Sequence, residues 1–371
     1  MKRLSFISSY LAKNFFLYLT STLILALFFS AQSCKSPTGP KTNSPPDTTS
    51  NNFTFQTFTF GASNAGSSYL KDIVVVSDSD IWCVGAIYLD SADGAPDPNA
   101  YNALHWNGES WEMKRIFYYG SCSAVKYPPL KAICTLSDNN IIVTNGGSIG
   151  WLSGDSVRLD CGVNPLLAGA INKIWGINSN DFYIVGNGGS IAHYQNGTWQ
   201  KVESGTNMNI YDIWGASNPQ TGKTEILAVA SYPDTSAQRK IIQINGTNAT
   251  DISSSGINWD LESVWFKPQS QYFVAGSGIY NKNFLTDNTW SSQYFNVTNY
   301  YINCIRGNDV NDVVAVGSFG EVIHYNGKSW KSFRDETGLS NGEYLSVAIK
   351  GNEIVAVGYD GQNAVILVGK R

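Results

Sequence analysis

The sequence is poor in positive charge, and its basic residues form no cluster. Its 371 residues include 25 Lys and Arg against 29 Asp and Glu, with no run of basic residues. Because proteins bind nucleic acids through clustered Lys and Arg, we expect no nucleic-acid partner. The three His and six Cys show no CxxC or Cys/His spacing, so the sequence predicts no metal site built from these ligands and no resident cofactor.

Sustained helical periodicity is also missing after the first fifty residues. Short runs rich in Ile, Val, Tyr and Trp alternate with turns of Asn, Asp and Gly, a pattern typical of antiparallel strands. The sequence therefore predicts an all-β protein.

The first 33 residues have the three parts of a secretory signal. Three basic residues up to Lys13 precede a largely apolar run, Phe15–Phe29, and small residues follow it. The run has 15 residues, fewer than the roughly 20 that a membrane-spanning helix needs. We therefore expect residues 1–33 to be a signal peptide.

The residues before Cys34, Ala31-Gln32-Ser33, resemble the lipobox of bacterial lipoproteins. Ser before the Cys is similar to the relaxed lipobox of Bacteroidetes-like bacteria, while Ala31 departs from the usual Leu. The resemblance implies that Cys34 is diacylated and anchors the mature chain to the membrane through its lipid alone. An ordinary cleaved signal followed by an incidental Cys is the alternative.

Residues 34–52 are expected to form a disordered tether. Between residues 35 and 52 there are four prolines and no large apolar side chain, so the segment cannot bury enough surface to fold. Lys35 follows the Cys, and no acidic cluster is present. By analogy with lipoproteins this favours the outer membrane of a cell envelope and leaves open which side the protein faces.

A unit of about 40 residues recurs seven times, which is typical of a radial repeat. In the copy Ile171–Asn207 we expect strands at Ile171–Trp175, Phe182–Val185 and Ser190–Tyr194, and a fourth near Trp199. One such sheet cannot bury both faces alone, so neighbouring units must stack into a β-propeller. The other copies begin at Leu70, Leu130, Ile210, Leu261, Ile302 and Leu345.

The last unit, Leu345–Arg371, contains only three strand-like runs. The missing strand is available at Phe53–Phe60, which is rich in Phe and Thr. We therefore predict a seven-bladed β-propeller of four-stranded antiparallel blades over residues 53–371, with this N-terminal strand completing the last blade. Such closure removes an exposed sheet edge, and we expect a monomer.

The repeat pattern IWG…DxxxVGxxGxIxHYxG…W resembles the repeats of bacterial propellers of the BNR-like and photosystem II assembly-factor-like kind. The resemblance covers residues 53–371 and implies the fold, but not a function, because propellers carry many activities. The turns of the form NG-x-[S/T]-W also resemble the Asp-box of sialidases, but they lack its Ser and Asp. A sialidase-like activity is therefore weakly supported.

Most chemically active side chains fall at repeat positions. His105, His193 and His324 occupy the same slot of three units, so we expect them to bond within their own blades. Asp80, Asp181 and Asp312 precede the second strand, where Asp commonly caps backbone N–H groups.

The cysteines differ in their setting. Cys83 and Cys134 lie within expected strands, whereas Cys122 and Cys161 lie in loops that join neighbouring blades. Such loops share one rim, so we predict a Cys122–Cys161 disulfide in an exported protein. Two free thiols are the alternative.

Insertions interrupt the repeat at Ile87–Asn102 and Phe117–Pro129, on the rim that also holds Ser231–Lys240. Binding residues concentrate in such loops. Clustered carboxylates here could hold Ca²⁺, although the spacing matches no EF-hand and a solvated acidic loop is the alternative. The candidate ligand-binding residues are Tyr88, Asp90, Asp93, Asp97, Tyr101, Tyr118 and Tyr119.

We therefore expect a lipid-anchored binding or scaffolding module whose loop-rich face recognises an envelope protein or a glycan. No catalytic residue can be nominated, since no carboxylate pair stands out by spacing. A carbohydrate-active enzyme with carboxylates at the central opening is one alternative. A structural envelope protein without a specific ligand is the other.

Overall fold

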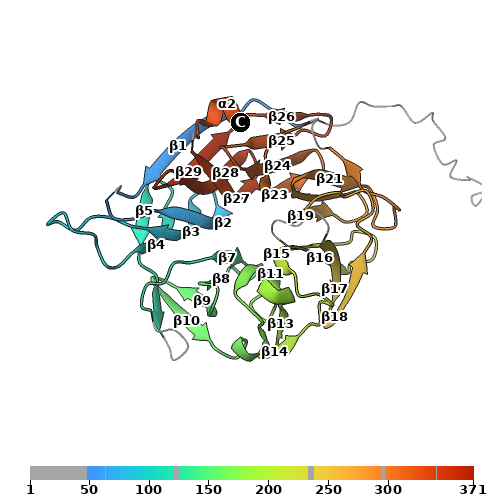
Figure 1. Cartoon of the computed structure of the whole chain (residues 1–371), viewed down its shortest axis with the longest axis horizontal. Coiled ribbons are helices and arrows are strands. Elements are labelled where there is room, and N and C mark those ends of the chain that lie inside the picture. Colours follow the sequence, from blue (N-terminus) through green and yellow to red (C-terminus); the bar gives the residue numbers. More distant parts are fainter. Residues whose placement is uncertain (1–47, 63, 120–124, 233–237, 294–296, 340) are drawn as a thin grey trace, which may run out of the picture. The chain divides into compact units, whose positions relative to one another are not determined.

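Seven antiparallel sheets surround a central axis and form a β-propeller, as the repeat predicts (Figure 1). The computed structural model describes residues 48–371 except 63, 120–124, 233–237, 294–296 and 340. The predicted signal peptide, Cys34 and most of the predicted tether lie outside these residues. Among the residues described, no helix is long and apolar enough to span a membrane.

Each blade is a meander whose first strand lies at the axis and whose fourth strand lies at the rim. Most turns inside a blade are short, and successive strands pair antiparallel. Asn196 and Gly197 both have positive φ, 49° and 85°, as the Asn-Gly hairpin requires. The strands of blades 1 to 3 are β2 (Tyr69–Ser77), β3 (Asp80–Ile87), β4 (Tyr101–Trp106), β5 (Trp111–Lys114), β7 (Ala132–Thr135), β8 (Ile141–Thr144), β9 (Ile149–Ser153), β10 (Ser156–Asp160), β11 (Ile171–Asn178), β12 (Asp181–Gly186), β13 (Ile191–Gln195) and β14 (Thr198–Lys201).

Blades 4 to 6 repeat this order, although the outer strand of blade 5 is only two residues long. Blade 2 differs by a fifth strand, β6 (Phe117–Tyr119), which pairs parallel with β10 and uses part of the second insertion. The strands of blades 4 to 6 are β15 (Asn209–Ser217), β16 (Thr224–Ser231), β17 (Arg239–Asn245), β18 (Asn248–Ile252), β19 (Leu261–Lys267), β20 (Gln271–Gly276), β21 (Gly278–Lys282), β22 (Ser291–Ser292), β23 (Ile302–Asp309), β24 (Asp312–Gly317), β25 (Val322–Tyr325) and β26 (Trp330–Ser332).

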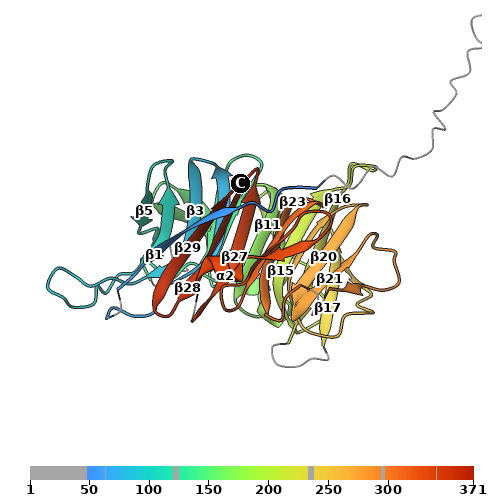
Figure 2. The ribbon, with the colours of Figure 1, turned by 90° about the horizontal axis from the view of Figure 1, so that it is seen from above.

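Blade 7 confirms the predicted closure. It consists of β27 (Gly342–Lys350), β28 (Glu353–Asp360), β29 (Asn363–Lys370) and the N-terminal strand β1 (Thr54–Phe60). β1 pairs antiparallel with β29 along its whole length, from Thr54 opposite Lys370 to Phe60 opposite Ala364. Figure 2 shows β1 beside β29. The pairing covers an edge that would otherwise be free.

Apolar side chains of neighbouring blades meet between the sheets. Phe182 of blade 3, for example, packs edge-on against Trp151 of blade 2, with ring centroids 5.9 Å apart. Most repeat tryptophans lie in these layers, as expected. The layers make the core a ring rather than a single centre.

The three histidines bond within their own blades, as predicted, and each donates from Nε2 to an aspartate carboxylate. The Nε2 atoms of His105, His193 and His324 lie 2.9, 2.7 and 2.7 Å from an aspartate oxygen. The partners are Asp80, Asp181 and Asp312. These carboxylates hold the histidines of the third strand, a role that the sequence did not predict.

The N-terminal approach to β1 is tied to blade 6. The Thr49 hydroxyl donates to the Asn311 carbonyl at 2.5 Å, and the Asn51 amide oxygen lies 2.6 Å from His324 Nδ1. Residues 49–51, which the sequence assigned to the tether, thus contact the propeller.

The cysteine prediction is only partly covered by the described residues. Cys161 is disulfide-bonded, whereas Cys83, Cys134 and Cys304 are free thiols. Cys122 lies outside the described residues, so the Cys122–Cys161 pairing stays a prediction. We expect non-reducing peptide mapping to recover these two in one cross-linked peptide, and alkylation of both as free thiols would contradict it.

Candidate functional site

The predicted loop residues do not converge into one site. Figure 1 shows the β3–β4 connection extending outward from the rim of the ring. Arg115 pairs with Asp97 and lies 4.0 Å from the centre of the Tyr101 ring. Asp93 and Asp97 accept backbone N–H groups of their own turns. Within the described part of the chain, no group of His, Cys, Asp or Glu is placed to hold a metal ion.

The two tyrosines of β6 have opposite environments. Tyr118 is buried between blades 1 and 2, with 3% of its surface exposed, so its nomination for ligand binding needs correction: it is a core residue. Tyr119 is 75% exposed at the outer edge. The loop residues Tyr88 and Asp90 lie at the inner end of the β3–β4 connection, where Asp90 bridges to Pro96.

The strongest concentration of buried polar groups lies instead on the central axis. The first strands of the blades do not pair with one another there, so their inner edges present unpaired backbone groups. In five blades a β-bulge follows the first residue of the repeat. In blade 7 the bulge lies at Leu345, between Tyr344 and Ser346, so Leu345 is structurally equivalent to the second residue of the other repeats. A bulge re-aims side chains, and both the second and third repeat residues therefore line the channel.

Third-position side chains satisfy the backbone of the next blade. Asp72 accepts the Ile133 N–H at 3.1 Å, and Asp212 accepts the Val264 N–H at 3.0 Å. Ser263 accepts the Ile305 N–H at 3.1 Å in the same way. The polar ring is thus part of how adjacent blades are joined.

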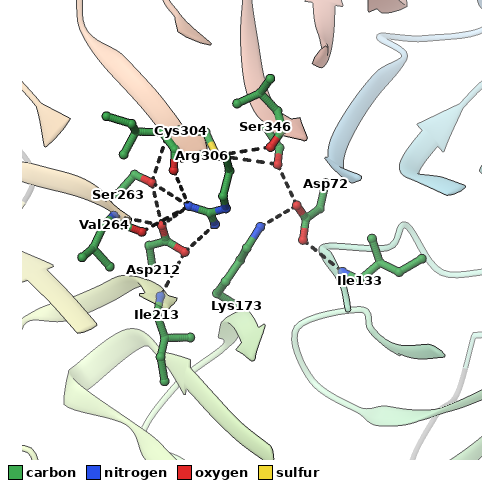
Figure 3. Close-up of polar contacts among 12 residues, drawn as sticks. Asp72, Ile133, Lys173, Asp212, Ile213, Ser263, Val264, Cys304, Arg306 and Ser346 are labelled. Carbon is green, nitrogen blue, oxygen red and sulfur yellow. Dashed lines mark hydrogen bonds and ion pairs between the residues drawn. The ribbon is translucent and has the colours of Figure 1, made fainter. Parts of the chain in front are cut away.

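Two ion pairs cross the channel (Figure 3). Arg306 donates to both oxygens of Asp212, at 2.8 and 2.9 Å. Lys173 donates to Asp72 at 2.5 Å, and the Ser346 hydroxyl donates to the same oxygen at 2.8 Å. Charges of opposite sign therefore balance inside the channel.

The pairs are buried enough to change proton affinities. Burial acts to raise the pKa of Asp212, but the charge and hydrogen bonds of Arg306 outweigh it and hold that pKa below its usual value. Lys173 and Arg306 each line two separate cavities of the channel, one on either side of the ion pairs. The four charged side chains consequently form a partition across the channel.

Arg306 occupies a slot that holds Trp in three other blades. Trp175 and Trp265 lie against a glycine of the following blade, Gly215 and Gly307 respectively. Blade 7 has Ile349 at that glycine position, as blade 5 has Phe266. The arginine instead turns into the channel, where its guanidinium lies 5.2 Å from the Trp214 ring centre.

Above this partition lies a polar cavity of about 310 Å³, which we call the mouth. Second-position side chains form its wall: Lys71, Lys131, Asn172, Tyr211, Glu262, Asn303 and Leu345.

Two lysines on adjacent blades give the mouth its positive charge. Lys131 donates to the Asn172 amide oxygen at 2.6 Å, and neither Lys71 nor Lys131 forms an ion pair within the described residues. Burial and the neighbouring Lys71 lower the pKa of Lys131. Two lysines that face one cavity without an ion pair among the described residues favour binding of an anionic group there.

Glu262 adds little negative charge at neutral pH. Its Oε2 atom accepts the Tyr301 hydroxyl at 3.2 Å. Burial raises the pKa of Glu262 to about 8, despite the opposing charge of Lys71. The carboxyl is therefore mostly protonated at pH 7 and can donate a hydrogen bond.

A second cavity, of about 530 Å³, adjoins the mouth and shares Lys71, Lys131 and Leu345 with it. Tyr69 and Tyr359 contribute aromatic wall. The Tyr359 hydroxyl donates to Glu343 Oε1 at 2.8 Å. Blades 7, 1 and 2 thus present a hollow that joins cationic and apolar surface.

Sequence reasoning missed the mouth, although a signal was present. Several repeats begin with an apolar residue followed by two polar ones, as in Leu70-Lys71-Asp72 and Ile171-Asn172-Lys173. Polar residues at the start of an innermost strand indicate a channel wall. Their convergence from seven blades depends on ring closure.

Comparison with known proteins supports the fold and not a family. No protein-family model and no curated protein matches the chain. Solved structures that resemble it include YCF48 bound to a D1 peptide, with a TM-score of 0.55, 13% identity, and coverage of 89% of this chain and 99% of that one. The WD40 propeller of Doa1 has a TM-score of 0.60, 12% identity, and coverage of 87% and 98%.

An enzyme is also among these structures. A catalytically inactive virginiamycin B lyase from Staphylococcus aureus, with quinupristin, has a TM-score of 0.54, 11% identity, and coverage of 85% and 99%. At these identities the likeness shows a β-propeller and leaves function to the site.

Proposed function

We propose that this chain is a binding module that takes an acidic segment of a partner protein at the mouth. The observation that carries the proposal is the Lys71–Lys131 pair, two cations from adjacent blades with no carboxylate partner among the described residues. Amide side chains around them, such as Asn172 and Asn303, can bond the peptide backbone of such a segment. The structure of YCF48 with a D1 peptide supports a peptide ligand for a propeller of this shape.

The hydrogen bonds that the channel carboxylates already accept favour a binding function over hydrolysis. A glycoside hydrolase needs a protonated carboxyl and a free carboxylate about 5–10 Å apart. Glu262 fits the first role, but Asp212 accepts donors from Arg306, Ser263, Val264 and Ile213. A carboxylate filled in this way is a poor nucleophile or base.

The location of the module is part of the proposal. Cys34 carries the lipid anchor, the segment after it is the tether, and the propeller stands at the outer membrane of a cell envelope. The signal-like and lipobox-like residues support this placement. Mass spectrometry of the mature N-terminal peptide tests it, and an unmodified Cys34 would contradict it.

Removing the two lysine charges should abolish most of the affinity. We expect dodecapeptides selected by display on the full-length mature protein to be rich in Asp and Glu. Their affinity for Lys71→Gln/Lys131→Gln should fall about a hundredfold or more, because each of the two charged hydrogen bonds contributes about 1.5–3 kcal/mol. Fluorescence anisotropy with labelled peptides measures the fall.

The control variant changes the net charge by the same amount at residues that do not line the mouth. Lys201→Gln/Lys267→Gln removes two lysines whose surface ion pairs lie elsewhere and should bind the same peptides as the wild type does. Equal affinity of the mouth variant and the wild type would refute the proposal, as would selection of peptides without acidic residues.

A further inference from the structure

Phe319, in the β24–β25 turn of blade 6, has a backbone conformation that suits glycine. Its φ is 58°, and the following Gly320 has φ 75°. The equivalent turn of blade 3 has Gly188 and Gly189 at φ 65° and 72°. A bulky residue in this left-handed region is strained, because its Cβ approaches its own backbone.

Burial does not compensate for this strain. Phe319 is 53% exposed, and its ring lies 5.6 Å from that of Tyr300, tilted by 53°. A glycine would satisfy the turn and expose less apolar surface. Strain kept at an exposed aromatic residue points to a role in recognition.

Hydrogen bonds from α2 to backbone carbonyls hold the turn in place. Arg334, the first residue of α2 (Arg334–Thr337), donates from Nε to the Phe319 carbonyl at 3.0 Å. Its guanidinium lies 4.6 Å from the centre of the Tyr300 ring. The Thr337 hydroxyl donates to the Gly320 carbonyl at 2.8 Å. We call Tyr300, Phe319 and Arg334 the aromatic ledge.

The ledge is connected to the mouth through one carboxylate. Glu343 Oε2 accepts the Ser318 hydroxyl at 3.2 Å and the Asn303 amide at 2.9 Å. Asn303 lines the mouth, and Ser318 precedes Phe319. The ledge therefore stands beside the mouth, within reach of one bound segment.

We propose that the aromatic ledge docks an apolar side chain of the same protein partner whose acidic segment enters the mouth. The residue types are those that dominate protein–protein binding energy, Tyr and Arg beside an exposed aromatic ring. This inference rests on the proposed function, because it takes the partner to be a protein.

Substitution of Phe319 should separate stability from binding. Phe319→Gly and Phe319→Asn both remove the ring and tolerate a positive φ. We expect the melting temperature to stay equal or rise by about 1–3 °C as strain is relieved. Affinity for peptides selected on the wild-type full-length protein should fall roughly tenfold or more.

The matched control is Ile177→Ser, which removes an apolar side chain that is 39% exposed near the C-terminal end of β11 and does not line the mouth. It should leave peptide affinity unchanged. Unchanged affinity in both Phe319 variants would overturn the ledge proposal, and so would a clear fall in melting temperature, because Phe319 would then support the fold.

The two proposals can fail separately. If peptide binding depends on Phe319 but is normal in the lysine variant, the proposal for the aromatic ledge stands and the proposal for the mouth is refuted. If peptide binding depends on the lysines alone, the reverse holds. Glycan-array binding that Phe319→Gly abolishes, without peptide binding, would overturn the assignment of a protein partner.

Discussion

Replacing Arg306 by methionine is expected to lower the free energy of unfolding by about 3–5 kcal/mol. Asp212 is 97% buried by surface area, with 3% exposed, and Arg306 supplies both of its charged hydrogen bonds. Without the guanidinium, a carboxylate would stay in the channel with its charge uncompensated. Urea unfolding followed by tryptophan fluorescence measures the loss.

A double variant distinguishes the effect of leaving Asp212 without its ion-pair partner from the effect of changing the packing at residue 306. In Asp212→Asn/Arg306→Met no uncompensated charge remains, so we expect it to be more stable than Arg306→Met alone. A loss below about 1 kcal/mol for the single variant would mean that water or Lys173 replaces the arginine.

Replacing Asp312 by alanine is expected to cost about 3 kcal/mol or more. Arg371 donates to both of its oxygens at 2.8 and 2.6 Å, and His324 lies at 2.7 Å. Arg371 also stacks over Phe53, just before β1, at 5.1 Å. The carboxylate thus holds together blade 6 and the two strands that close the ring, β1 and β29.

The same carboxylate should make stability depend on pH. Burial would raise the pKa of Asp312, but hydrogen bonds from His324, Arg371 and Asn308 outweigh it and lower the pKa to about 2. A depressed pKa means that the stabilisation is complete above the unfolded value near 4 and is lost as pH falls from about 4 to about 2. Unfolding midpoints measured across this range should fall less in Asp312→Ala than in the wild type.

Blade 1 provides the matched control. Asp80 also bonds its blade's histidine, but no arginine joins the pair and the Asp80 side chain is 39% exposed. Asp80→Ala should therefore cost less than about 1 kcal/mol. Equal losses in the two variants would show that the Asp–His pair, rather than the Arg371 contact, is responsible.

Much of the fold could be predicted because its signals are local. Strand runs in Ile171–Lys201 and the Asn196-Gly197 turn match the structure within a few residues. The three-stranded last unit also identified β1 as the closing strand. The ion pairs were not foreseen, because Asp212 and Arg306 are 94 residues apart in sequence.

The site was predicted less well, because its residues come together only through contacts between blades that are far apart in sequence. Insertions such as Ile87–Asn102 break the repeat visibly, so they attracted the functional prediction. Yet Tyr118 became core when β6 joined blade 2. Lys71 and Lys131 looked like ordinary repeat residues, and only ring closure places them at one cavity.

The sequence by itself determined the blade, the number of blades and the way the ring closes, because alternation, turn chemistry and repeat length act over a few neighbouring residues. Only tertiary contacts place these polar residues together on the axis, where a bulge in six of the seven first strands turns two successive side chains toward the channel. Tertiary structure also decided that Arg306 faces Asp212 and that Phe319 stays exposed under strain. Those outcomes depend on distances between blades, which no local pattern encodes.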